Sequence, residues 1–110
     1  MAKKKSYTVQ EENLLLSIAY NTACQTEGVA SLAKEPRLLF KNHKKKYSGI
    51  KLLISGEYVA ADVTIAAYYG SKIPEVAFSI QKRIKTEIEG STRFKIRTVN
   101  VNVIGVIFTS

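Results

Sequence analysis

The sequence predicts a single α+β domain, a two-layer sandwich in which two helices cover one face of a mainly antiparallel sheet. Two segments carry apolar residues at helical spacing, shorter segments alternate apolar and polar residues, and glycine or proline separates them. A chain of 110 residues is too short for two ordinary cores, so we expect one domain over residues 6–110. The predicted order of elements is β-α-β-β-β-α-β.

The first part of the chain predicts an edge strand followed by a helix. Ser6–Val9 alternates apolar and polar residues over a short stretch, which is typical of a strand. Thr8 and Glu11 have the spacing of a capping box, so we expect a helix from about Glu11 to Thr26. Its buried stripe is predicted to contain Leu14, Leu15, Ile18, Ala19, Thr22 and Ala23. Gly28 suits the end of this helix because glycine tolerates a positive φ.

The middle of the chain predicts a brief strand and then a hairpin. Val29–Ala33 is the brief apolar run, and Ile50–Ser55 alternates apolar and polar residues as a strand does. Gly56 and Glu57 fit a two-residue hairpin turn with glycine first. The returning strand, Tyr58–Tyr69, has one face that is more apolar, which we expect against the helices. That face consists of Val59, Ala61, Val63, Ile65, Ala67 and Tyr69.

The last third predicts a helix and a closing strand that changes face twice. Pro74 suits the first turn of the helix, and the apolar stripe that follows ends near Gly90. This stripe consists of Ile73, Val76, Ala77, Ile80, Ile84 and Ile88. The face expected in solvent carries Ser79, Lys82, Arg83 and Glu89. In the closing strand, Lys95–Phe108, the parity of the apolar positions switches near Arg97–Thr98 and again near Gly105, so we expect two β-bulges.

Positive charge is concentrated in a tail and a loop. The net charge is +8, and the basic residues gather in a tail at 1–5, expected to be disordered, and in a long mobile loop at 34–48. The positive electrostatic field of these residues attracts phosphate groups, whether of nucleic acid or of an anionic membrane. The competing interpretation is that the charges only improve the solubility of the protein. The residues predicted to contact an anionic surface are Lys3, Lys4, Lys5, Arg37, Lys41, Lys44, Lys45 and Lys46.

The residues predict no catalytic, metal or cofactor site, so we expect a protein that is not an enzyme. One cysteine, Cys24, and one histidine, His43, fall on a helix and in a loop, which does not suit a zinc site or a nucleophile pair. We interpret Asp62, in mid-strand, as a cross-strand partner of a lysine or a hydroxyl. Gly70–Lys72 lacks the spacing of a phosphate-binding loop and offers at most a helix N-terminus for a weakly held anion.

The outer sheet face and one strand edge are the predicted interaction surfaces. We expect Tyr58, Tyr68, Asn100 and Asn102 to lie on the face that the helices leave open, as a partner-binding face. The long closing strand is expected to present an unpaired edge, which invites self-association. Exposed tyrosines and basic arms are also compatible with a small nucleic-acid-binding module. Neither a membrane-spanning run nor a secretory signal is present in this sequence, so we expect a cytoplasmic protein.

The C-terminal half of the sequence contains a set of motifs in a fixed order, namely Tyr69–Ala77, the helix pairs Ile80–Gln81 and Ile84–Lys85, and Val99–Val103 with Gly105–Val106. With these motifs the sequence resembles the alkaline shock protein family, the envelope stress response proteins of Gram-positive bacteria. It is strong from Gly49 to Phe108 and weaker before that point. The earlier helix leading to Gly28 and the hairpin from Ile50 to Tyr69 follow the order of elements in the family.

The resemblance implies a cytoplasmic protein without known enzymatic activity that acts at the cell envelope. Some members are held at the membrane by an integral partner and self-assemble. We therefore expect a non-catalytic scaffold or adaptor at the inner face of the membrane, with protein partners that include an integral anchor. The chain departs from better-known members in being strongly basic and in carrying a basic segment at 34–46 in place of a shorter one. Such a member could touch anionic lipid directly, and the nucleic-acid-binding module remains the alternative.

Overall fold

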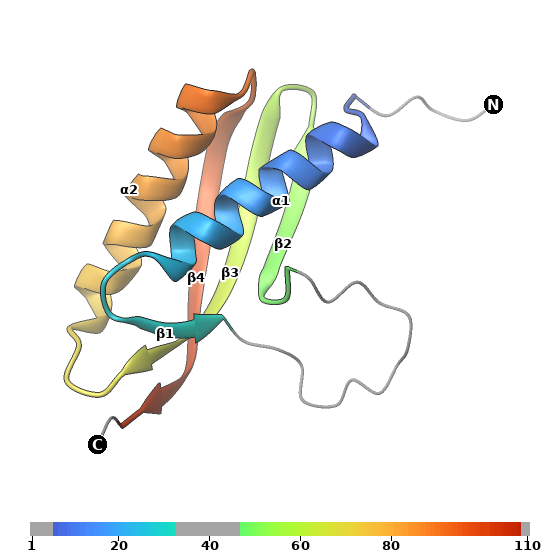
Figure 1. The fold of residues 1–110 in the computed structure, drawn as a ribbon. Coiled ribbons are helices and arrows are strands. Elements are labelled where there is room, and N and C mark those ends of the chain that lie inside the picture. Colours follow the sequence, from blue (N-terminus) through green and yellow to red (C-terminus); the bar gives the residue numbers. More distant parts are fainter. Residues whose placement is uncertain (1–5, 33–46, 109–110) are drawn as a thin grey trace, which may run out of the picture.

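A computed structural model describes residues 6–32 and 47–108 of the protein (Figure 1). Both helices lie on the same face of the sheet, as Figure 1 shows, so the predicted α+β class and its two layers are confirmed. The elements, in chain order, are α1 (Val9–Cys24), β1 (Val29–Leu32), β2 (Ile50–Ser55), β3 (Tyr58–Tyr68), α2 (Ile73–Ser91) and β4 (Lys95–Ile107).

Helix α1 begins at Val9, because Thr8 is its N-cap. The Glu11 N–H donates to Thr8 Oγ1 and the Thr8 N–H donates to Glu11 Oε1, both at 3.0 Å, which is the predicted capping box. The predicted strand at Ser6–Val9 is therefore wrong, since these residues form a bend and the helix start. The buried residues of α1 belong to the predicted stripe, but Leu14 is 48% exposed. They are Leu15, Ala19, Thr22 and Ala23.

Strand β3 is the centre of the sheet and has three partners. Strand β2 pairs with it antiparallel along residues 58–63, and β1 pairs with it antiparallel along residues 65–67, so these two strands lie end to end on one edge. Strand β4 runs parallel to β3 along the opposite edge, over the whole length of β3. A parallel pair needs a crossover connection, and α2 provides it. The sheet is mixed, because two of the three strand pairings are antiparallel and the third is parallel.

Strand β4 contains both predicted bulges. At the first, Arg97 is the extra residue, because its two neighbours pair with consecutive residues of β3. At the second, Ile104 is the extra residue for the same reason, and Gly105 follows it directly. The apolar side chains before, between and after the bulges are thereby returned to the helix-facing side of the sheet.

The core lies between the two helices and the inward face of β3. The predicted stripe of α2 is buried at Val76, Ile80, Ile84 and Ile88, and Pro74 occupies the first turn as predicted. The inward side chains of β3 from Val59 to Ala67 are almost completely buried. Tyr69, which was expected on this face, is 68% exposed, because β3 ends at Tyr68 and Gly70 turns the chain with a φ of 95°.

Gly28 allows the turn before β1 to pack directly against α2. Helix α1 already ends at its C-cap, Gln25, so the prediction that Gly28 ends the helix is wrong. Gly28 instead has a φ of 97°, and a Cβ atom built on it would lie 2.5 Å from Val76 Cγ2. Both the left-handed backbone and the close approach require glycine at this position.

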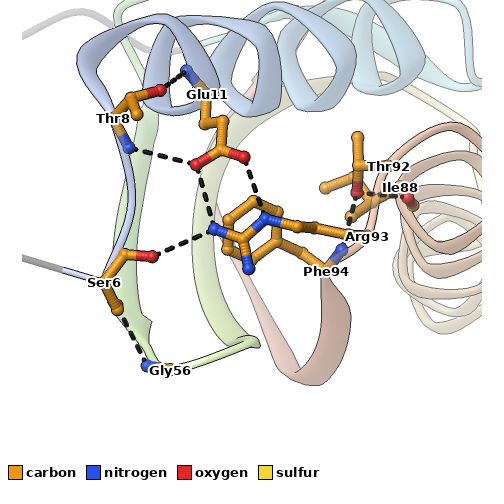
Figure 2. A network of polar contacts seen from close by, with 8 residues as sticks. All are labelled: Ser6, Thr8, Glu11, Gly56, Ile88, Thr92, Arg93 and Phe94. Carbon is orange, nitrogen blue, oxygen red and sulfur yellow. Dashed lines mark hydrogen bonds and ion pairs between the residues drawn. The ribbon is translucent and has the colours of Figure 1, made fainter.

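A polar junction ties the start of α1 to the turn before β4 (Figure 2). Arg93 donates from Nε to Glu11 Oε2 at 2.9 Å and from Nη2 to Glu11 Oε1 at 3.0 Å, and its Nη2 also donates to the Ser6 carbonyl. The guanidinium lies 4.3 Å from the centroid of the Phe94 ring. The Arg93 hydrogen bonds, and then the Thr8 N–H, hold the pKa of the Glu11 carboxyl below its usual value. The capping carboxylate therefore also positions α1.

Candidate partner-binding surface

The basic residues predicted to contact an anionic surface lie outside the described residues. They are Lys3, Lys4, Lys5, Arg37, Lys41, Lys44, Lys45 and Lys46. The predicted tail at 1–5 and the part of the predicted loop up to residue 46 lie outside as well. The attachment points of the loop are described, because Leu32 pairs with Ile65 and Ile50 pairs with Val63. The basic segment is thus attached beside the middle of β3.

The four residues of the predicted partner face lie on the outer side of the sheet, spread along the length of β3 and β4. Tyr58 and Tyr68 stand at the two ends of β3 and are 43% and 41% exposed. Asn100 and Asn102, both exposed, come from the neighbouring strand β4. Asn100 Nδ2 donates to Asp62 Oδ1 at 3.0 Å, so Asp62 has a cross-strand partner, although that partner is an amide.

Two side chains of α2, Gln81 and Glu89, reach the edge of β4 that points away from β3, and Lys85 lies between them on the helix. Gln81, Lys85 and Glu89 are four residues apart, which places them in one column on the helix surface. Gln81 Nε2 donates to the Val99 carbonyl at 3.0 Å, and Glu89 Oε2 accepts from the Ile96 N–H at 2.9 Å. Lys85 Nζ lies 3.1 Å from Glu89 Oε2. We call this set the α2 column.

The α2 column was not predicted, and Glu89 was wrongly placed on the face expected in solvent. Glu89 is only half-buried, but its carboxylate accepts a hydrogen bond from the Ile96 N–H at the edge of β4. The Ile96 N–H, followed by Lys85, keeps the pKa of the Glu89 carboxyl below its usual value, and the charge of Lys95 adds to this effect. The available signal was the four-residue spacing of these side chains directly beside the apolar stripe.

A shallow groove of about 430 Å³ lies along two residues of the α2 column and the first half of β4. Its described lining includes two basic side chains, Lys85 and Arg97, and no acidic one. The full lining is Gln81, Lys85, Ile96, Arg97, Thr98, Val99 and Asn100. Arg97 is the residue of the first bulge, and its guanidinium carbon lies 5.1 Å from the centroid of the Tyr58 ring. The bulge therefore links the groove to the outer face.

Exposed apolar side chains lie on both faces of the sheet where β3 and β4 end, since Val106 pairs with the inward Ala67 and Ile107 pairs with the outward Tyr68. We call this group the C-terminal cluster, and its side chains are between 41% and 70% exposed. It consists of Tyr68, Tyr69, Ile104, Val106, Ile107 and Phe108. The rings of Tyr69 and Phe108 stack with their centroids 4.5 Å apart, and the Tyr69 N–H donates to the Ile107 carbonyl. The α2 column bonds to the first half of β4, whereas the cluster lies on the second half.

A second hollow, of about 260 Å³, lies at the start of α2. Ser71 and Lys72 line it, as expected for a helix N-terminus, but so do the carboxylates of Glu27 and Glu75. Two carboxylates oppose an anion, so the geometry does not favour the weak anion site expected near Gly70–Lys72.

The remaining candidate residues do not converge. Cys24 is free and exposed at the C-terminal end of α1, and His43 lies outside the described residues. Within residues 6–32 and 47–108, no group of three or more His, Cys, Asp or Glu side chains is arranged to hold a metal ion. None of the helices in these ranges is long and apolar enough to cross a membrane.

Three curated bacterial proteins are similar to the chain. It is 31% identical over 84 residues to the uncharacterized protein Spy1535 of Streptococcus pyogenes, covering 76% of the chain and 65% of that protein. It is 30% identical over 67 residues to YqhY and 32% identical over 68 residues to YloU, both from Bacillus subtilis and both uncharacterized. Each of these two alignments covers 61% of the chain, with 47% of YqhY and 57% of YloU. The chain thus spans about half to two thirds of these relatives.

Solved structures of the MamM CTD share the fold. The copper form has a TM-score of 0.61 at 13% identity, covering 87% of each chain. A cadmium form of a variant has a TM-score of 0.54 at 14% identity, covering 86% of this chain and 96% of that one. At such low identity the likeness concerns the fold alone.

The family comparison agrees with the motifs that carry the resemblance. The family model that is described as "cell envelope-related function" matches residues 1–108, so the chain belongs to this family of alkaline shock proteins.

Proposed function

We propose that the protein is a non-catalytic scaffold or adaptor at the cell envelope, acting in envelope stress response or homeostasis through contacts with other proteins. The cell envelope-related function of the family supports the envelope setting. The observation that carries the scaffold role is the C-terminal cluster beside an edge strand. Clustered exposed apolar side chains mark interaction sites, and a strand edge offers backbone groups to another chain.

We propose that a second copy of this chain binds to the C-terminal cluster. Strand β4 is an outer strand of the sheet. Ile104 and Val106 lie near its end, Phe108 follows it directly, and all three side chains are exposed. When two such edges meet across a two-fold axis, the same apolar side chains of both copies leave water together. Removal of this apolar surface from water favours association, against the loss of translational and rotational freedom.

Sedimentation velocity of the full chain over a range of concentrations tests this proposal. We expect association that increases with concentration, and its loss in the double variant Val106→Asp/Phe108→Asp. The matched control is Leu14→Asp/Leu53→Asp, which places the same charges at exposed apolar positions away from the cluster, 48% and 73% exposed. Circular dichroism checks that all variants fold. A wild-type chain that stays monomeric throughout, or equal loss in both variants, contradicts the proposal.

The basic tail and loop are proposed to assist attachment to an anionic surface at the inner face of the membrane. A lysine close to such a surface contributes on the order of 1 kcal/mol. The test is co-sedimentation with phosphatidylglycerol-containing liposomes, compared with neutral phosphatidylcholine liposomes. Changing Lys3–Lys5 and Lys44–Lys46 to glutamine is expected to abolish the preference for anionic lipid. An unchanged preference removes the lipid contact and leaves attachment to an integral membrane partner.

The outer sheet face supports one alternative, a nucleic-acid-binding module. Tyr58 and Tyr68 are both exposed there, and the guanidinium of Arg97 lies over the Tyr58 ring. Aromatic side chains on a sheet can stack bases, and lysines contact phosphates. Binding of a single-stranded oligonucleotide at about 50 mM salt, with quenching of tyrosine fluorescence and steep weakening at higher salt, favours this alternative. No binding under these conditions excludes it.

A further inference from the structure

We propose that the groove between α2 and the first half of β4 binds an extended, acidic segment of a partner protein, which adds to the sheet as a strand beside β4. The inference rests on the proposed scaffold function and names a class of ligand for it. It concerns a surface separate from the C-terminal cluster, because the groove is lined by residues 96–100 and not by the end of β4.

The α2 column already imitates a neighbouring strand at this edge. The Glu89 carboxylate accepts from the Ile96 N–H, as a strand carbonyl would. The Gln81 amide donates to the Val99 carbonyl, as a strand N–H would. Replacing one hydrogen bond by another has a small net cost, whereas leaving a backbone group unpaired costs more. An incoming strand can therefore exchange with these exposed or half-buried side chains.

Charge selects an acidic ligand for the groove. Lys85 and Arg97 are its charged lining residues, and Lys95, exposed, lies one residue before the lining segment. The Glu89 carboxylate pairs with Lys85 and also accepts from the Ile96 N–H. A strand that displaces this carboxylate would leave Lys85 without its acidic partner, so an acidic residue of the strand would replace it. The lysine-rich segments at 1–5 and 33–46 have the wrong sign for this groove.

The geometry also favours alternating acidic residues in the ligand. Successive side chains of an added strand point to opposite faces of the sheet. Lys85 stands on the helix side of β4, while Arg97 reaches the outer face beside Tyr58. Carboxylates on either side of the added strand therefore each find a cation.

The test measures fluorescence anisotropy of a labelled peptide of about ten residues that alternates glutamate and valine, long enough for one strand. A lysine–valine peptide of the same length is the control ligand. We expect the glutamate peptide to bind and the lysine peptide not to bind. Lys85→Glu/Arg97→Glu should weaken binding at least about tenfold. The matched variant Lys82→Glu/Arg83→Glu makes the same charge change on α2 outside the groove and should bind nearly as the wild type does.

A second pair of variants tests the exchange at Ile96. Glu89→Ala and Glu89→Gln both remove the negative charge, but glutamine retains an oxygen that can accept from the Ile96 N–H. We therefore expect Glu89→Ala to bind the peptide more tightly than Glu89→Gln. If Lys85→Glu/Arg97→Glu fails to fold, Lys85→Gln/Arg97→Gln replaces it, with a smaller expected loss.

Several outcomes overturn the inference. They are equal binding of the two peptides, equal weakening by the two charge reversals, and no difference between the two Glu89 variants. The Val106→Asp/Phe108→Asp variant should still bind the peptide, because the C-terminal cluster is not part of the groove. If the wild-type chain associates with itself but does not bind the glutamate peptide, this inference alone is refuted. If it binds the peptide but stays monomeric, the proposed self-association alone is refuted.

Discussion

Replacing Gly28 by alanine should destabilise the protein more than the same change at any open glycine. Gly28 has a φ of 97° and would place a Cβ atom 2.5 Å from Val76 Cγ2. Gly70 provides the matched comparison, because it has a φ of 95° and open space within 4 Å of its Cβ position. The two variants share the backbone strain, and only Gly28→Ala adds the overlap.

The expected magnitudes follow from these two contributions. A left-handed backbone costs a residue with a Cβ atom roughly 1–2 kcal/mol. Overpacking in a close-packed interior costs typically about 1–3 kcal/mol more. The entropy that alanine removes from the unfolded chain is common to both variants and cancels in their difference. The free energy of unfolding should therefore fall by about 1–3 kcal/mol more in Gly28→Ala than in Gly70→Ala.

Urea unfolding followed by circular dichroism measures both changes. The double variant Gly28→Ala/Val76→Ala identifies the clashing atom, because alanine at position 76 lacks Cγ2. The double variant should be more stable than the sum of the single changes implies, by about 0.5–3 kcal/mol. Equal losses in Gly28→Ala and Gly70→Ala, or strict additivity with Val76→Ala, would refute the close approach of the two segments.

Three further results are expected. Phe94→Ala should lower the free energy of unfolding by about 3–5 kcal/mol in the same urea assay, because Phe94 is 2% exposed. Thermal stability should fall as the pH drops below 4.5, the ordinary pKa of the Glu11 and Glu89 carboxyls, because both have lowered pKa values in the folded protein. The ionised forms stabilise the fold above that pH, so Glu11→Gln/Glu89→Gln should flatten the acid limb of a melting-temperature profile. Deleting Ile104 should leave a cooperative thermal transition, because the following residues keep their pairing. Inserting a residue after Val101 should abolish it, because every later side chain up to the second bulge changes face.

Local patterns predicted the features that depend on local geometry. The apolar positions of β4 switch twice between even and odd residue numbers. An extra residue at each switch is needed to keep them on one buried face, so both bulges could be predicted. The stripe of α2 follows from the helical period. The strand expected at Ser6–Val9 failed because alternation over so few residues is weaker than the capping box that begins α1 there.

Pairing between strands could not be predicted in the same way. Alternation shows which face a residue occupies, but not which strand lies beside it, so the parallel pairing of β3 with β4 had no local signal. The placement of Tyr58, Tyr68, Asn100 and Asn102 on the outer face of the sheet could be predicted, because it follows from alternation alone. The α2 column was missed because Glu89 was interpreted as a solvent-facing residue, and only the position of the β4 edge gives Gln81 and Glu89 their partners.

The end-to-end arrangement of β1 and β2 makes one place in the chain unusually permissive for engineering. Leu32 and Ile50 are held opposite Ile65 and Val63, so the two ends of the intervening stretch are fixed close together whatever its length. Doubling the length of such a closed segment costs only about 0.6 kcal/mol in chain entropy. A fluorescent reporter or an affinity tag inserted there should leave the sheet, the groove and the C-terminal cluster undisturbed.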